Sequence, residues 1–151
     1  MTTSNVETGV ATATAEEAAA RDVVDRVNAA WGRNDPDAFA DAYTEDATLI
    51  LSGDRYFSGR EHIRQALHQS FEHEHKGTRL LTEVVSFRWI GPQVASMVTE
   101  GGVLIPGESS PNWERALRAT WIATRGADGV YLVASYQNGR RADGSLRGTE
   151  E

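Results

Sequence analysis

The chain contains no cysteine among its 151 residues. Disulfide bonds, thiolate catalysis and cysteine-ligated metal sites are therefore excluded. It has a single lysine beside 14 arginines, and its formal net charge is −7. Because the arginines are scattered and do not cluster on one helix, no nucleic-acid-binding surface is predicted.

Long apolar runs are missing as well. No segment approaches the roughly 20 residues that a membrane span requires, so no membrane contact is predicted. The opening stretch, MTTSNVETGVATATA, lacks the basic region and apolar segment of a secretory signal, and we expect a cytoplasmic protein. The chain also lacks a glycine-rich phosphate loop and a metal-ligand cluster, so no cofactor is expected.

The length fits one domain with a sizeable core. Residues 1–13 are small and polar and are predicted to form a disordered tail, because they have little apolar surface to bury. The folded domain is predicted over residues 14–140. Residues 141–151 are again small and charged and are expected to form a flexible tail.

Two helices are predicted from capping boxes followed by apolar residues at helical spacing. Thr14 with Glu17 begins the first, and Ser58 with Glu61 begins the other. In a capping box, the two side chains satisfy each other's free backbone N–H groups at the start of the helix.

Between these helices lie a shorter helix and a strand. Asp35 as the N-cap and Pro36 at the first helical position predict a helix that runs to Tyr43. Residues 47–51, ATLIL, predict a short strand. Beyond Gly77 the apolar period changes from 3.6 to 2, which predicts four long strands at about 79–90, 93–104, 114–125 and 129–138.

This order of elements is typical of an α+β fold in which a curved sheet wraps around helices and encloses a pocket. Both faces of the last two strands are partly apolar. We expect one face, which includes Trp121, to point away from the helices, where a second copy of the chain covers it. A homodimer with Trp121 at the interface is therefore predicted. The apolar residues of this face are Leu117, Ala119, Trp121 and Ala123.

Several local motifs resemble the NTF2-like superfamily, the cone fold of SnoaL-like proteins and ketosteroid isomerases. They are Ala30-Trp31 before Asp35-Pro36-Asp37, YTEDAT at 43–48, FSGRE at 57–61 and GVYLVASYQN at 129–138. The resemblance implies three N-terminal helices packed on a strongly curved antiparallel or mixed β-sheet. Within the superfamily, Arg118-Ala119-Thr120 and Gln137-Asn138 are most similar to the SgcJ/EcaC group of enediyne gene clusters.

The resemblance implies a small-molecule pocket protein of bacterial secondary metabolism, acting on a hydrophobic polyketide- or enediyne-type intermediate as an isomerase or cyclase. The alternative is a non-catalytic module that holds a labile product or docks on a biosynthetic synthase. The acid–base set of a classical ketosteroid isomerase, an Asp base with a Tyr and a protonated Asp, is absent. Leu51, Val27 and Thr120 stand at the aligned positions.

Four polar residues are candidates for catalysis. Arg118, Thr120 and Gln137 share one strand face, which we assign to the pocket, where they could hold a carboxylate or polarise a carbonyl. The alternative is that Arg118 forms a structural ion pair and Gln137 satisfies backbone groups. His62, one step off the buried stripe of its helix, is a candidate acid or base or simply a surface residue.

The pocket wall is expected to be mostly aromatic, although aromatic residues at helical spacing also serve as ordinary core. His68, His73 and His75 are not expected to bind a metal, because their spacing does not bring them to one helix face. The predicted wall comprises Trp31, Tyr43, Phe57, Phe71, Trp89 and Asn138.

Overall fold

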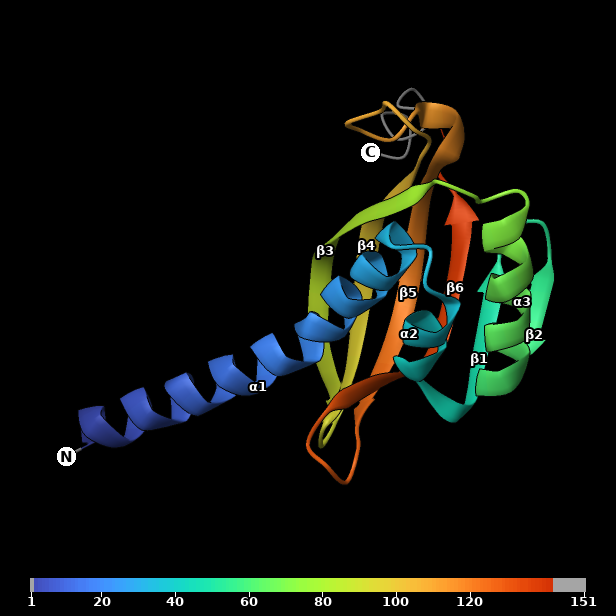
Figure 1. The fold of residues 1–151 in the computed structure, drawn as a ribbon. Helices are drawn as coiled ribbons and strands as arrows, with labels where there is room; N and C mark the ends of the chain where they lie inside the picture. Colours follow the sequence, from blue (N-terminus) through green and yellow to red (C-terminus); the bar gives the residue numbers. More distant parts are fainter. Residues whose placement is uncertain (1, 143–151) are drawn as a thin grey trace.

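The protein, seen in a computed structural model, is built on one curved, mixed β-sheet (Figure 1). The structure describes residues 2–142, with side chains from residue 15 onward. The strands follow the spatial order β2-β1-β6-β5-β4-β3. Their bounds are Tyr43–Leu51 for β1, Arg55–Ser58 for β2, Arg79–Gly91 for β3, Val94–Leu104 for β4, Ala116–Arg125 for β5 and Tyr131–Arg140 for β6.

The closing strand β6 lies in the middle of the sheet. It pairs parallel with β1 and antiparallel with β5, and the other neighbouring strands are antiparallel. The pairing register shifts between Val84 and Ser86 and again between Ile122 and Ala123. Such bulges bend the strand that carries them and increase the local twist, which suits a sheet that wraps around helices.

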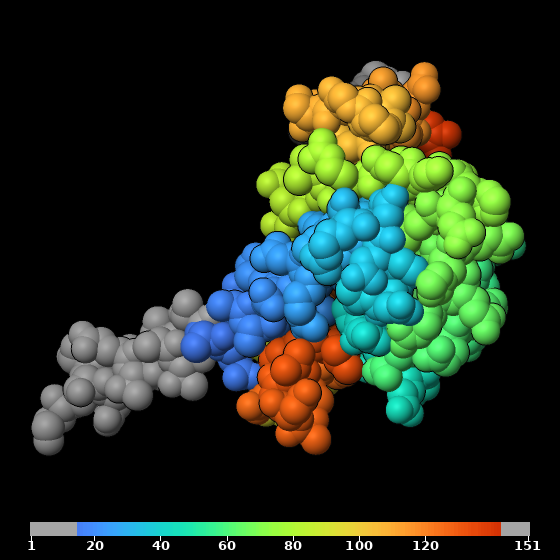
Figure 2. All heavy atoms as spheres, viewed as in Figure 1, coloured from blue at the N-terminus to red at the C-terminus, as the bar shows by residue number. Residues whose placement is uncertain are grey.

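Three helices cover the concave face of this sheet (Figure 1). They are α1 (Thr2–Gly32), α2 (Pro36–Asp41) and α3 (Arg60–Glu72), and the short η1 (Trp113–Arg115) precedes β5. In the space-filling view, the end of α1 that follows residue 15, α2 and α3 lie side by side across one face of the molecule (Figure 2). The α+β cone is thus confirmed, but the three helices are not all N-terminal: only α1 is, whereas α2 and α3 lie mid-chain and α3 follows β2.

The start of the first helix was predicted wrongly. α1 begins at Thr2 and not at Thr14, so the Thr14–Glu17 pair lies inside the helix, and the helix includes residues assigned to a disordered tail. Alanine has the highest helix propensity of any residue, and two alanines, Ala11 and Ala13, lie before Thr14 while four more follow by residue 20. Residues 143–151 of the predicted C-terminal tail lie outside the described residues.

The start of α2 was predicted correctly from the sequence, and the start of α3 was not. Asp35 caps α2 as predicted, because its carboxylate accepts a hydrogen bond from the Ala38 N–H at 3.0 Å. The capping box of α3 was wrong, since Gly59 is the N-cap and makes no side-chain hydrogen bond. Ser58 instead belongs to β2, an edge strand that was not predicted.

The solid part of the core lies where α1 packs on the strands β3, β5 and β6. Trp121 is fully buried there, its indole Nε1 donates to the Thr99 hydroxyl at 2.8 Å, and its ring meets Tyr136 edge-on at 4.8 Å. Ala119 and Ala123 on the same strand face are buried too. This face therefore packs against the helices, and the prediction that Trp121 lies at a dimer interface was wrong.

Replacing Trp121 tests this placement. We expect Trp121→Ala to lower the free energy of unfolding by about 3–5 kcal/mol, because it opens a cavity and removes a buried hydrogen bond. Trp113→Ala is the control, since Trp113 is 43% exposed and should change stability far less. Urea denaturation measures both, and equal, small losses would contradict the assignment.

Candidate functional site

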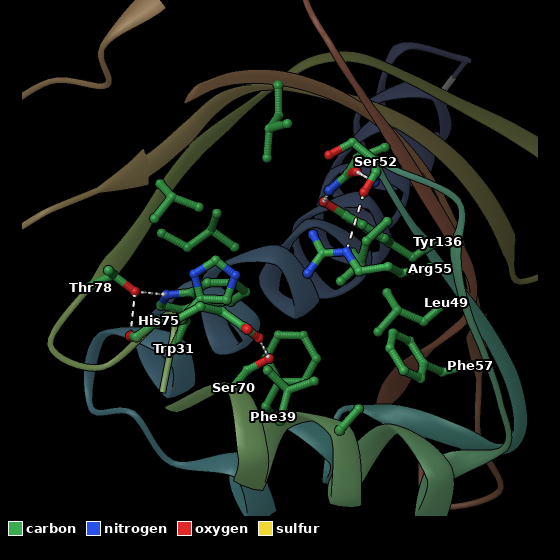
Figure 3. A pocket seen from close by; sticks show the side chains of 18 of the residues that line it. Trp31, Phe39, Leu49, Ser52, Arg55, Phe57, Ser70, His75, Thr78 and Tyr136 are labelled. Carbon is green, nitrogen blue, oxygen red and sulfur yellow. Dashed lines mark hydrogen bonds between the residues drawn. The ribbon is translucent and has the colours of Figure 1, made fainter. Parts of the chain in front are cut away.

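A cavity of about 880 Å³ lies beside the solid core, enclosed by the sheet, α2, α3 and the C-terminal end of α1 (Figure 3). Its size falls within the range of about 300–1,000 Å³ that is usual for small-molecule sites. The wall is largely apolar, with polar groups gathered in a few places. The apolar part includes Val27, Trp31, Phe39, Tyr43, Leu49, Leu51, Phe57, Ala66, Leu67, Leu80, Val103 and Leu117.

A row of aromatic rings forms the helical side of this wall. The ring centroids of His75 and Trp31 are 5.0 Å apart, those of Trp31 and Phe39 are 6.0 Å apart, and those of Phe39 and Tyr43 are 5.3 Å apart. Trp31 is held by a hydrogen bond of 2.9 Å from its Nε1 to the Thr78 hydroxyl. The row thus connects the loop after α3 to the beginning of β1.

Tyr43 is the most unusual member of this row. It is fully buried, yet its hydroxyl has no hydrogen-bond partner within the described part of the chain. Burial, together with the neighbouring Tyr136, raises the pKa of Tyr43 well above its usual value, so the phenol stays protonated. A buried phenol normally finds a partner, and the Tyr43 hydroxyl is therefore an unsatisfied donor within the cavity wall, with almost none of its oxygen surface exposed.

Tyr136 brings a second protonated phenol to the same wall. Burial raises the pKa of Tyr136 to about 12. Its oxygen accepts a hydrogen bond of 3.0 Å from the Asn138 amide, whose own oxygen accepts from the Ser52 N–H at 2.8 Å. Because Asn138 donates to this oxygen, the hydroxyl proton of Tyr136 is left to donate elsewhere.

His75 supplies a titratable group at the other end of the aromatic row (Figure 3). Burial is the main cause that lowers the pKa of His75, with Glu74 opposing the shift and Arg55 adding to it. The imidazole is therefore neutral at pH 7 and able to accept a proton. The sequence had suggested only a metal-binding role for His75, which its spacing disfavoured, so its position in the wall was missed.

His62 lines the cavity, but one of its nitrogens is already engaged. Its Nδ1 accepts a hydrogen bond of 3.2 Å from the Ser58 N–H, and its ring packs edge-on against Phe57 at 5.2 Å. The side chain thus helps to fix the junction between β2 and α3. Among the predicted wall residues, those that line the cavity are Trp31, Tyr43, Phe57 and Asn138.

Phe71 and Trp89 do not line it. Phe71 is buried in the core, edge-on to the Trp31 ring at 5.3 Å. Trp89 lies on β3 beside Phe87 and Tyr131 and is 38% exposed. Of the positions aligned with the ketosteroid isomerase residues, Val27 and Leu51 line the cavity and Thr120 does not.

The predicted group of Arg118, Thr120 and Gln137 lies on the outer face of the sheet, away from the cavity. Arg118 forms an ion pair with Glu100 at 2.9 Å, while Thr120 and Gln137 are exposed and adjacent in register. The strand face was assigned wrongly, because the apolar face of β5 covers the helices and not a partner. The structural interpretation of Arg118 is the one that its ion pair supports.

Within the described residues, no group of three or more His, Asp or Glu side chains is arranged to hold a metal ion. No helix of the described chain has both the length and the apolar composition needed to cross a membrane.

The SnoaL-like domain family matches residues 12–136, and the chain belongs to this family. Its cystatin-like fold is shared with NTF2-like proteins of known structure. No curated protein matches the chain. A domain of unknown function from Nostoc punctiforme is 28% identical, with a TM-score of 0.80 over 91% of this chain and 84% of that chain.

Two more distant structures share the fold alone. A ketosteroid isomerase-like protein from Erwinia carotovora atroseptica is 19% identical, with a TM-score of 0.67 over 85% of this chain and 98% of that chain. A calcium/calmodulin-dependent protein kinase type II association domain from Thiobacillus denitrificans is 16% identical, with a TM-score of 0.68 over 80% and 93%.

The unsatisfied phenol gives a stability prediction. We expect Tyr43→Phe to leave the free energy of unfolding unchanged or to raise it, by up to about 1–3 kcal/mol, because it removes a buried donor that lacks a partner. The matched control is Tyr131→Phe, since the Tyr131 hydroxyl lies 2.6 Å from Glu16 Oε1 and its loss should cost about 1–2 kcal/mol. Guanidinium denaturation measures the free energy of unfolding of both variants. Equal destabilisation would show that the Tyr43 hydroxyl has a partner in the unliganded protein.

Proposed function

We propose that the cavity binds a largely apolar small molecule through one carbonyl oxygen and shifts a proton beside that carbonyl, an isomerase-like reaction. The unpartnered, protonated hydroxyl of Tyr43 at the cavity wall carries this proposal. When a proton leaves the carbon next to a carbonyl, negative charge builds on the oxygen. Donors already in place in a dry site stabilise that charge strongly.

In this reaction, Tyr43 and Tyr136 donate hydrogen bonds to the carbonyl oxygen, and neutral His75, at the far end of the aromatic row, takes the proton from a carbon that is conjugated with that carbonyl. The electron pair of the broken C–H bond forms the new C=C bond, and the carbonyl π electrons move to oxygen. Return of the proton to a different carbon completes an isomerisation. Both phenols stay protonated because their pKa values are raised, and the lowered pKa of His75 keeps it in the accepting form.

Binding without chemistry is the alternative function. Only burial and Tyr136 affect the pKa of Tyr43, so no carboxylate base of the described residues stands beside that phenol. A module that holds a labile product, or docks on a synthase, needs the donors and not the base. The resemblance to the SgcJ/EcaC group supports a polyketide- or enediyne-type molecule from bacterial secondary metabolism as the ligand in either case.

Proton exchange in 2-tetralone tests the reaction. This ketone enolises readily, and NMR in D₂O follows the loss of its α-proton signal. The protein should accelerate the exchange, and both Tyr43→Phe and His75→Asn should reduce the rate at least tenfold, a loss of about 1.4 kcal/mol of transition-state stabilisation. The rate should decline only below pH 6.5, the usual pKa of histidine, since folding lowers the pKa of His75.

His68→Asn is the control, because His68 lies on α3 beside Asp37 and is not part of the cavity wall. It should exchange 2-tetralone at the wild-type rate. Saturable binding of 2-tetralone with no acceleration would contradict the reaction and support the binding module.

A homodimer is part of the proposal, now seated on the opposite strand face. The outer face of the sheet is free of helices and carries Val85 and Ile90, which are 50% and 47% exposed, beside the half-buried Val98 and Ile122. A second copy of the chain, packed on this surface, removes its apolar side chains from water.

Ile122→Glu should convert a wild-type dimer to a monomer in sedimentation velocity at micromolar concentration, because Ile122 lies between Ser96 and Ser135 at the centre of this face. Val130→Glu, in the exposed β5–β6 turn, should leave the dimer intact. A monomeric wild-type protein would end the proposal.

A further inference from the structure

Two arginines lie at the rim of the cavity, and the proposed reaction gives neither of them a role. Arg55 lies on β2, and Arg140 is the last residue of β6. Both side chains line the cavity. Among the described residues, neither has a carboxylate within ion-pair distance of 4.0 Å. The one hydrogen bond that Arg55 donates there is a long one, 3.3 Å to the Ser52 carbonyl.

Strand register explains why both side chains reach the same rim. Arg55 pairs with Leu51, and Arg140 pairs with Leu117, and both of these leucines belong to the cavity wall. Asn138, two residues before Arg140 on the same face, accepts from the Ser52 N–H and so ties β6 to the end of β1. Only β1 lies between β2 and β6, which places the two backbones about 10 Å apart.

The other charged side chains of the cavity wall include two that are engaged and Glu114, which forms no ion pair among the described residues. Arg115 pairs with Glu108, and the Glu74 carboxylate accepts a hydrogen bond of 2.8 Å from the Ser70 hydroxyl. In Figure 3, the Arg55 guanidinium extends into the cavity, toward the side that holds His75 and Trp31. The free guanidinium groups are conspicuous in a protein of net charge −7, where carboxylates outnumber arginines and lysine by 22 to 15.

We infer that the ligand is an amphipathic carboxylate, whose apolar body fills the aromatic cavity and whose carboxylate is bound at the rim by Arg55 and Arg140. Guanidinium groups bind carboxylates through two parallel charge-assisted hydrogen bonds. The inference rests on the proposed function, because the same molecule presents its carbonyl to Tyr43. It adds that binding selects for a terminal negative charge.

The test uses two fluorescent probes of equal apolar size, 4-(2-naphthyl)butanoate and 4-(2-naphthyl)butan-1-ol. The wild-type protein should bind the acid about tenfold more tightly than the alcohol, a difference of about 1.4 kcal/mol that fits a partly exposed charged hydrogen bond. Arg55→Gln and Arg140→Gln should each weaken binding of the acid and leave the alcohol unchanged. The double variant should abolish the preference.

Arg118→Gln is the matched control, since it removes an arginine from the outer face, and it should keep the full preference for the acid. Equal affinities of the wild-type protein for the two probes would overturn the inference while leaving the proton-transfer proposal untouched. If both probes bind the wild-type protein and all variants alike, the rim arginines do not select the ligand. If neither probe binds, the cavity is not a site for such molecules, and the proposed function fails with the inference.

Discussion

The structure depends on which face of β5 and β6 meets the helices. Trp121 and Tyr136 stand edge-on to each other on the concave face, and Trp121 is fully buried with its indole N–H donating to the Thr99 hydroxyl. On one side of this pair α1 packs against the sheet and leaves a solid core. On the other side α2, α3 and the C-terminal end of α1 enclose the cavity, and Tyr136 belongs to both regions. The same aromatic pair thus supports the core and provides a polar group for the site.

The fold could be predicted from the sequence because its signals are local and periodic. The four long strands were placed to within a few residues, since alternating apolar side chains and glycine-rich turns mark them. Asp35 and Pro36 marked α2 through ordinary capping chemistry. The edge strand β2 was missed because it spans only Arg55–Ser58, and Ser58 also suits a helix start.

The site could be predicted only in part, for a different physical reason. Alternation along a strand shows which residues share a face, but it does not show which face meets the helices. On β5 the apolar face was assigned to a partner and the polar face to the pocket, so Arg118 and Thr120 were placed inside when they lie outside. Tyr43 and Trp31 were predicted correctly as cavity-wall residues, because aromatic side chains near helix ends pack either in the core or in the wall of a cavity. The orphaned hydroxyl of Tyr43 and the lowered pKa of His75 arise from burial by distant segments, which no local pattern reveals.

The central claim is that the Tyr43 hydroxyl meets an oxygen of the ligand. A crystal structure with 2-naphthol, the aromatic counterpart of the enol of 2-tetralone, tests it most directly. The account predicts the naphthalene rings among Trp31, Phe39 and Leu49, with the naphthol oxygen at about 2.6–3.0 Å from the Tyr43 hydroxyl, the usual range for O–H···O bonds. A naphthol oxygen turned toward solvent, with Tyr43 still without a partner, would contradict it.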